Sequence, residues 1–155
     1  MTHPTDHAGI RLPAELADQL LEHARLEHPN ESCALLGGSA SSGAVTSVHL
    51  ARNRLASPYR YEIAAADLVR IVHAIDASGE DLVAIFHSHP TTPPVPSPTD
   101  RREARYAAIQ LIAGVSAGTP ALAAWKLDGP HAVRVGLAIG DSLESDRASA
   151  RGGRS

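Results

Sequence analysis

Two histidines separated by one residue end an apolar segment, in Phe86-His-Ser-His-Pro90. Because side chains alternate along a β-strand, His87 and His89 would point to the same face. Two neutral imidazoles at this spacing can share one metal ion, and a catalytic zinc usually takes three protein ligands and leaves a fourth position open. Asp100 is the obvious third ligand, because four prolines within residues 90–96 stiffen the loop that returns it to the histidines. The segment therefore predicts a metal site.

The residues around Asp100 also have an interpretation without a metal. Ser97-Pro-Thr-Asp100 is a good start for a helix, with Ser97 as the N-cap, Pro98 at the first position and Asp100 at the third. Capping would leave the two histidines and the prolines unexplained. Both interpretations can hold together, since a capped helix start would fix the carboxylate.

The elements that must position these residues alternate between helix and strand. Apolar spacing predicts helices over residues 13–29 and 65–77, and a short helix after Pro98. Short apolar or alternating segments predict strands at 33–37, 44–50, 59–63, 82–86, 109–115, 121–128 and 131–138. The continuously apolar 82–86 suits a central strand that is buried on both faces. The expected fold class is α/β, with a single mixed β-sheet flanked by helices.

Length and composition favour one domain. The chain has 155 residues, with 43% hydrophobic and 20% charged residues, as in ordinary globular proteins. We expect the domain to span residues 11–140, between a flexible tail at 1–10 and a disordered tail at 141–155, where the sequence is polar and without periodicity. The tails have no assigned role.

Charge, aromatic content and cysteine usage exclude several classes of function. A net charge of −3 and five aromatic residues (one Phe, three Tyr, one Trp) argue against a nucleic-acid partner. A single cysteine, Cys33, excludes an internal disulfide and is expected to be a small buried strand residue. No apolar stretch approaches the ~20 residues of a membrane span, and the first residues lack a signal-peptide pattern, so no membrane association and a cytoplasmic location are expected.

The metal-site segment resembles a known family. His87-Ser-His89-Pro90, five residues, Pro96-Ser97, two residues and Asp100 is similar to the zinc motif of the MPN/JAMM metalloproteases. Upstream, the segment from His28 to Gly38 resembles the part of the family that carries a glutamate, with Glu31 at that position. The resemblance spans roughly residues 10–140 and is greatest to the short stand-alone prokaryotic members.

The resemblance implies a cytidine-deaminase-like α/β fold and a mechanism. It makes His87, His89 and Asp100 the ligands of Zn²⁺, which would activate water and polarise the scissile carbonyl. It makes Glu31 the general base and Ser97 a hydrogen-bond donor to the oxyanion. The implied activity is that of a metallopeptidase or isopeptidase.

The resemblance also implies a substrate class. Short prokaryotic members are typically linked to ubiquitin-like sulfur-carrier proteins with a Gly-Gly tail, which they trim or from which they release cysteine; isopeptide cleavage is a further option. We expect a sheet edge beside the site to hold such an extended tail by strand addition. The physiological metal and the oligomeric state stay open.

Two other functions fit the sequence less well than zinc-dependent hydrolysis of a peptide or isopeptide bond. A catalytically inactive MPN scaffold that only binds partners would be expected to lose the metal ligands, whereas this chain keeps them. A nucleobase deaminase needs two cysteine ligands, and the single cysteine excludes it. The remaining seven histidines lack ligand spacing, and Trp125 is expected in the core or on the sheet surface.

Overall fold

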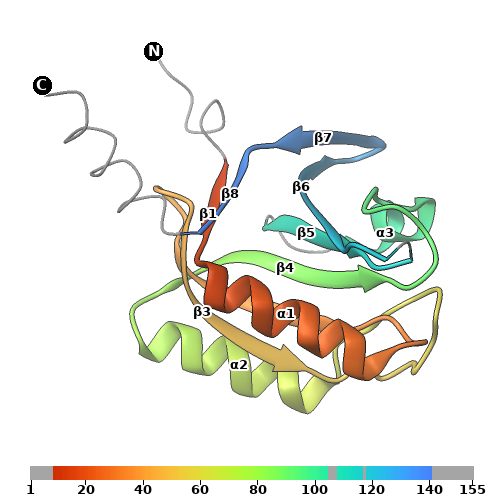
Figure 1. The fold of residues 1–155 in the computed structure, drawn as a ribbon. Helices are drawn as coiled ribbons and strands as arrows, with labels where there is room; N and C mark the ends of the chain where they lie inside the picture. The colour runs from red at the N-terminus through yellow and green to blue at the C-terminus, as the bar shows by residue number, and fades with distance from the viewer. Residues whose placement is uncertain (1–8, 105–107, 117, 141–155) are drawn as a thin grey trace, which may run out of the picture.

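The computed structural model describes residues 9–104, 108–116 and 118–140. All of its strands lie in one mixed sheet with the order β7-β6-β5-β4-β2-β3-β1-β8 (Figure 1). The elements follow one another as β1 (Ile10–Leu12), α1 (Ala14–Glu27), β2 (Cys33–Ser39), β3 (Ala44–Ala51), α2 (Ala65–Ala77), β4 (Asp81–His89), α3 (Pro98–Glu103), β5 (Ile109–Gly114), β6 (Ala121–Asp128), β7 (His131–Val135) and β8 (Leu137–Ile139). The predicted fold class is confirmed.

Strand β4 lies in the middle of the sheet and carries both candidate histidine ligands. It pairs with β2 in antiparallel and with β5 in parallel orientation, and its residues 83–89 are buried. This confirms the buried central strand predicted from 82–86 and extends it through His89. Because β4 and β5 are parallel, the chain must cross over between them. The proline loop and α3 form this crossover and return Asp100 to the carboxyl end of β4.

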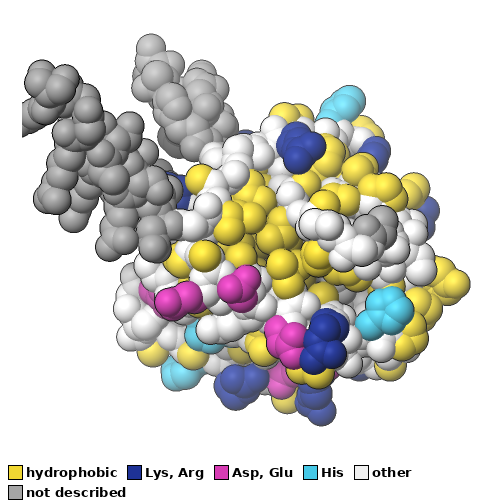
Figure 2. All heavy atoms as spheres, viewed as in Figure 1, with side chains coloured by type: hydrophobic (Ala, Val, Ile, Leu, Met, Phe, Trp, Pro, Cys, Tyr) yellow, Lys and Arg dark blue, Asp and Glu magenta, His cyan; other side chains and the backbone are white. Residues whose placement is uncertain are grey.

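Two helices cover opposite faces of the sheet, as the alternation of side chains along the strands requires. Leu20 of α1 belongs to one buried cluster with Leu36 and Phe86, whereas Ile71 of α2 packs in a second cluster with Cys33. The view in Figure 2 shows apolar side chains gathered over the sheet beside α1. The ligand face of β4 is therefore the α2 face, since His87 is paired directly with Cys33.

The predicted strand at 59–63 is wrong. Only one isolated bridge, between Asn53 and Ile63, forms there. The Asn53 side chain instead organises a loop: its Oδ1 accepts the N–H groups of Leu55 and Glu62, and its Nδ2 donates to the carbonyl of Arg60. Side-chain hydrogen bonds thus replace the ladder that the β-prone residues suggested.

The strand predicted at 131–138 is divided at Gly136 into β7 and β8, and β8 pairs with β1 rather than with β6. Strand β1 was not predicted, because three residues carry almost no periodicity. It begins at Ile10, the last residue assigned to the N-terminal tail, and Ile10 is buried. The rest of the two predicted tails, apart from Gly9, lies outside the described residues.

None of the described helices is long and apolar enough to cross a bilayer.

The packing of α1 on the sheet predicts that two leucines of this helix contribute very differently to the free energy of unfolding. Leu20 is fully buried against the sheet and Leu26 is 65% exposed on the same helix. Leu20→Ala should therefore lower the free energy of unfolding by about 2–5 kcal/mol, and Leu26→Ala should change it by less than about 0.5 kcal/mol. Urea denaturation of both variants measures this difference, and equal losses would show that α1 does not pack as described.

Candidate metal centre

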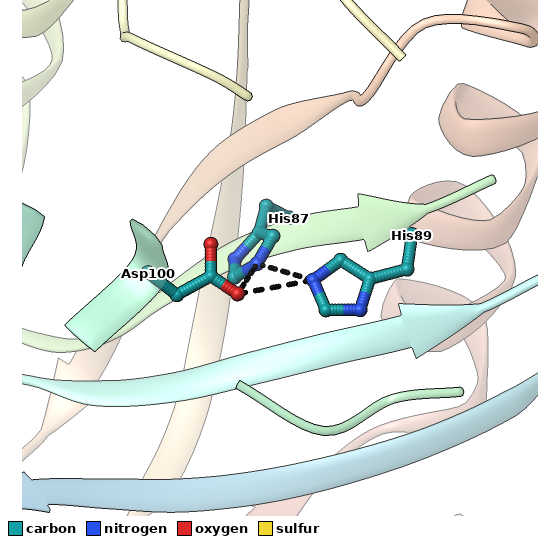
Figure 3. A group of neighbouring side chains, drawn as sticks. All are labelled: His87, His89 and Asp100. Carbon is teal, nitrogen blue, oxygen red and sulfur yellow. Dashed lines mark hydrogen bonds and ion pairs between the residues drawn. The ribbon is translucent and has the colours of Figure 1, made fainter. Parts of the chain in front are cut away.

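Three side chains converge at the carboxyl end of β4 (Figure 3). Oδ2 of Asp100 lies 3.1 Å from Nε2 of His87 and 3.1 Å from Nε2 of His89, and the two nitrogen atoms are 3.1 Å apart. Ligand atoms around a tetrahedral zinc with bonds of about 2.0–2.1 Å lie roughly 3.3–3.4 Å apart. Two imidazole nitrogens and one carboxylate oxygen in this triangle fit a zinc ion. They are the only group of this kind among the described residues.

Burial and hydrogen bonds act in opposite directions on the pKa values of the triad. Burial alone would raise the pKa of Asp100, but hydrogen bonds with His87 and His89 outweigh burial and hold that pKa well below its usual range. Burial lowers the pKa of His87, which is fully enclosed. Burial also lowers the pKa of His89, but hydrogen bonds with Asp100 and Pro93 outweigh burial and raise it. A histidine binds a metal as the neutral imidazole, so metal binding would compete with protonation of His89.

Each histidine ring has a neighbour that limits its orientation. Nδ1 of His89 donates a hydrogen bond of 2.8 Å to the carbonyl oxygen of Pro93, which in the neutral ring leaves the Nε2 lone pair for a ligand. The ring of His87 stacks on Tyr61 at a centroid distance of 4.6 Å. Tyr61 was not predicted as part of the site. It lies in a loop far from His87 in the sequence, so no local pattern connects the two residues.

Asp100 is both a helix-capping residue and a member of the triad. Its N–H donates to Oγ of Ser97, and Ser97 N–H donates to Oδ2 of Asp100, which completes a capping box at the start of α3. The same Oδ2 atom faces both histidines. Both interpretations of the sequence are thus compatible in one structure, and the cap holds the carboxylate in place.

Glu31 lies on the β2 side of the triad. Ser32, the next residue, accepts Ser88 N–H through its carbonyl and donates its own N–H to Oγ of Ser88, so Glu31 is held opposite the end of β4. Burial raises the pKa of Glu31 to about 8, and the charge on His89 counteracts this. Oε1 of Glu31 is buried and has no hydrogen-bond partner within the described residues. Sequence reasoning missed the contact between the two serines, because it joins positions 56 residues apart.

A cavity of about 240 Å³ lies against Asp100. It is lined by Tyr61, Glu103 and Gln110, and by Ile85, which precedes His87 on the same face of β4. Gln110 is only 4% exposed and its side chain makes no hydrogen bond within the described part of the chain. The cavity leads to the candidate metal centre.

Strand β4 has a neighbour on each side, so an extended peptide cannot pair with the strand that carries the histidines. The outer side of β3 is different, because β1 pairs with β3 only at Ala44. Within the described residues, the rest of β3, up to Ala51, keeps an unpaired edge two strands away from His87. Strand addition beside the site stays a prediction.

The mixed sheet and the His-His-Asp group define the chain as an α/β domain with a candidate metal centre at the carboxyl end of a central strand. The sequence profile of Prok-JAB, the prokaryotic homologs of the JAB domain, matches residues 13–128, and the chain belongs to this family.

Solved structures share the fold. The structure of DSY2949 from Desulfitobacterium hafniense has a TM-score of 0.77 and 26% identity, and the match covers 88% of this chain and 96% of that one. The JAB1/MPN domain protein AF2198 from Archaeoglobus fulgidus has a TM-score of 0.57 with 19% identity, covering 85% of this chain and 97% of that one, and shows the fold alone.

Three named relatives have matching sequences. The desampylase of Haloferax volcanii is 38% identical over 102 residues, 63% of this chain and 73% of that protein. The CysO-cysteine peptidase of Mycobacterium tuberculosis is 32% identical over 87 residues, 56% and 60% of the two chains. A probable TtuB-protein conjugate cleaving protease of Thermus thermophilus is 30% identical over 113 residues, 72% and 75% of the two chains.

The buried position of Cys33 beside His87 predicts an unreactive thiol. Burial raises the pKa of Cys33 to about 12, and the residue has no exposed surface. Because the thiolate is the reacting form, a thiol reagent such as Ellman's reagent should label the folded protein only as fast as it unfolds. Labelling in urea gives the control. Rapid labelling of the folded chain would contradict both the burial and the expectation that Cys33 is structural.

Proposed function

We propose that the chain is a zinc-dependent peptidase or isopeptidase of the JAMM type. It hydrolyses the bond after the C-terminal Gly-Gly of a ubiquitin-like sulfur-carrier protein, in the cytoplasm as expected from the sequence. The observation that carries the proposal is the convergence of Nε2 of His87, Nε2 of His89 and Oδ2 of Asp100 to 3.1 Å from one another. The names of two relatives describe a CysO-cysteine peptidase and a protease that cleaves TtuB–protein conjugates, and both support the substrate class.

In this proposal His87, His89 and Asp100 hold the zinc ion. When bound, zinc lowers the pKa of water to about 7 and polarises a carbonyl oxygen as a Lewis acid. The complete set of ligands, together with Glu31 and Ser97, does not favour the alternative of an inactive scaffold. No cysteine is needed for this chemistry, in agreement with the buried position of Cys33.

Glu31 accepts a proton from the attacking water and passes it to the leaving amine. A general base works best when its pKa is near the working pH, and burial has already moved the pKa of this carboxyl group to about 8. A divalent cation at the triad would lower that pKa, as the charge on His89 does. Oε1, which lacks a partner within the described residues, is the atom that is free to take the proton.

Ser97 stabilises the negative charge that develops on the carbonyl oxygen. Its Oγ already accepts the N–H of Asp100 at 3.0 Å, and the hydroxyl proton makes no hydrogen bond within the described residues. The capping box therefore fixes Ser97 oxygen next to the triad and leaves one donor for the substrate.

The cavity beside Asp100 is the space that the tail of the carrier protein would occupy. A volume of about 240 Å³ is below the range of roughly 300–1,000 Å³ that holds drug-sized ligands. It suits a few small residues such as glycine, and the Gln110 amide can bond to their main chain.

The direct test is cleavage of a defined carrier. The purified protein is incubated with a Gly-Gly carrier that ends in cysteine, with one joined to a lysine side chain, and with short Gly-Gly peptides, and the products are followed by mass. Cleavage after the last glycine, with the intact carriers preferred over the peptides, supports the proposal. Equal cleavage of unrelated unfolded proteins would point to a general peptidase instead.

Glu31→Gln should separate metal binding from turnover. The variant should keep the zinc and lose activity by at least about 10²–10⁴-fold, because the carboxylate moves protons and is not a ligand. Elemental analysis and the cleavage assay measure the two properties on the same sample. Turnover at the unaltered rate would show that another group is the general base.

Ser97→Ala should reduce kcat by about 10²–10³-fold, as expected for the loss of one oxyanion donor. Ser97→Thr is the matched control, since threonine keeps both the hydroxyl proton and the ability to cap α3. If both variants lost activity equally, retention of the hydroxyl would not preserve activity, and the role of Ser97 as oxyanion donor would be wrong.

Removal of the metal should abolish cleavage and leave the fold. The described hydrophobic clusters do not include the triad, so dialysis against a chelator should leave the far-ultraviolet circular dichroism unchanged. Full activity of a protein shown to be free of metal would contradict the proposal.

A further inference from the structure

The loop that follows His89 is held by its carbonyl groups. Four of its seven residues, 90–96, are prolines, which have no N–H to donate. The carbonyl oxygen of Pro93 accepts Nδ1–H of His89, and the next carbonyl, that of Pro94, accepts the indole Nε1–H of Trp125 at 2.8 Å. Two successive carbonyl groups therefore connect a metal ligand to a residue of β6.

Strand pairing fixes the position of Trp125 in the sheet. Trp125 is paired with Gln110 of β5 and lies two strands away from β4. An indole N–H that is partly buried requires an acceptor, and the only one that Trp125 uses in the described chain is Pro94. Trp125 is the only tryptophan of the chain.

The loop also packs against the backbone of a glycine in β5. Gly114 of β5 is the direct partner of His89 in the sheet. A Cβ atom on Gly114 would lie 2.8 Å from Cδ of Pro94 and 3.0 Å from its nitrogen, closer than real contacts allow. The absence of a side chain at Gly114 lets Pro94 approach β5 closely enough to reach Trp125.

We infer that Trp125 is a positioning residue of the metal centre: its hydrogen bond to Pro94 holds the loop whose Pro93 carbonyl orients His89. The inference rests on the metal site proposed above. Partners of this kind fix the ring orientation of a histidine ligand, and their loss typically weakens metal binding by 10–100-fold. Because the indole reaches the ligand only through the loop, Trp125 acts on the geometry of the site and not on the substrate.

The test measures zinc affinity of the full chain by competition with a chromogenic chelator. Replacement of Trp125 by benzothienylalanine, which keeps the ring and lacks the N–H, should weaken zinc binding by about 10–100-fold. Trp125→Phe and Gly114→Ala should do the same, with far-ultraviolet circular dichroism confirming the fold. Lys126→Gln, an exposed neighbour on β6, is the matched control and should bind zinc as the unaltered chain does.

The fluorescence of Trp125 provides a second readout. Zinc should change the emission of the unaltered chain and leave that of Asp100→Asn unchanged. Unaltered zinc affinity of the benzothienylalanine protein would overturn the inference while the metal site stands. No zinc binding by the unaltered chain would overturn the proposed metal site, and this inference with it.

Discussion

The Asp100 carboxylate lies between two imidazole rings, and its side chain is only 7% exposed. An ionised carboxylate in such a place is costly unless it is compensated by hydrogen bonds or by a cation. His87, His89 and the N–H of Ser97 provide that compensation through one oxygen atom. The rest of the structure can be understood as the means of bringing these groups from two segments, the end of β4 and the start of α3, to one point.

Two local rules provide most of this geometry. The period of two along β4 places His87 and His89 on one face, and the capping box of α3 fixes the carboxylate relative to the helix start. The crossover between the parallel strands β4 and β5 then brings the cap to the end of β4. The prolines of the loop have no N–H groups to donate, so the loop cannot pair with the sheet as a strand would. Contacts with Gly114 and Trp125 set its path instead.

The sequence predicts the parts that depend on such local rules. The central strand, the helix at 65–77, the pair of histidines and the cap at Ser97 all follow from spacing within a few residues. Glu31 could be named only through the family resemblance, because its place beside the triad depends on the pairing of Ser32 with Ser88, 56 residues away. The same limit explains the stacking of Tyr61 on His87 and the bond from Trp125 to Pro94.

Errors in the prediction of strands have a related cause. Residues 59–63 have a strand-like composition, but Asn53 binds their backbone and keeps them in a loop. Strands β1 and β8 are three residues each and exist because they pair with one another, which no local pattern reveals.

Crystals of the protein grown with zinc test the central claim most directly, through diffraction data on both sides of the zinc absorption edge. The account predicts one anomalous peak at bonding distance from Nε2 of His87, Nε2 of His89 and Oδ2 of Asp100. A fully occupied zinc site formed by other side chains, with no peak at this triad, would contradict it.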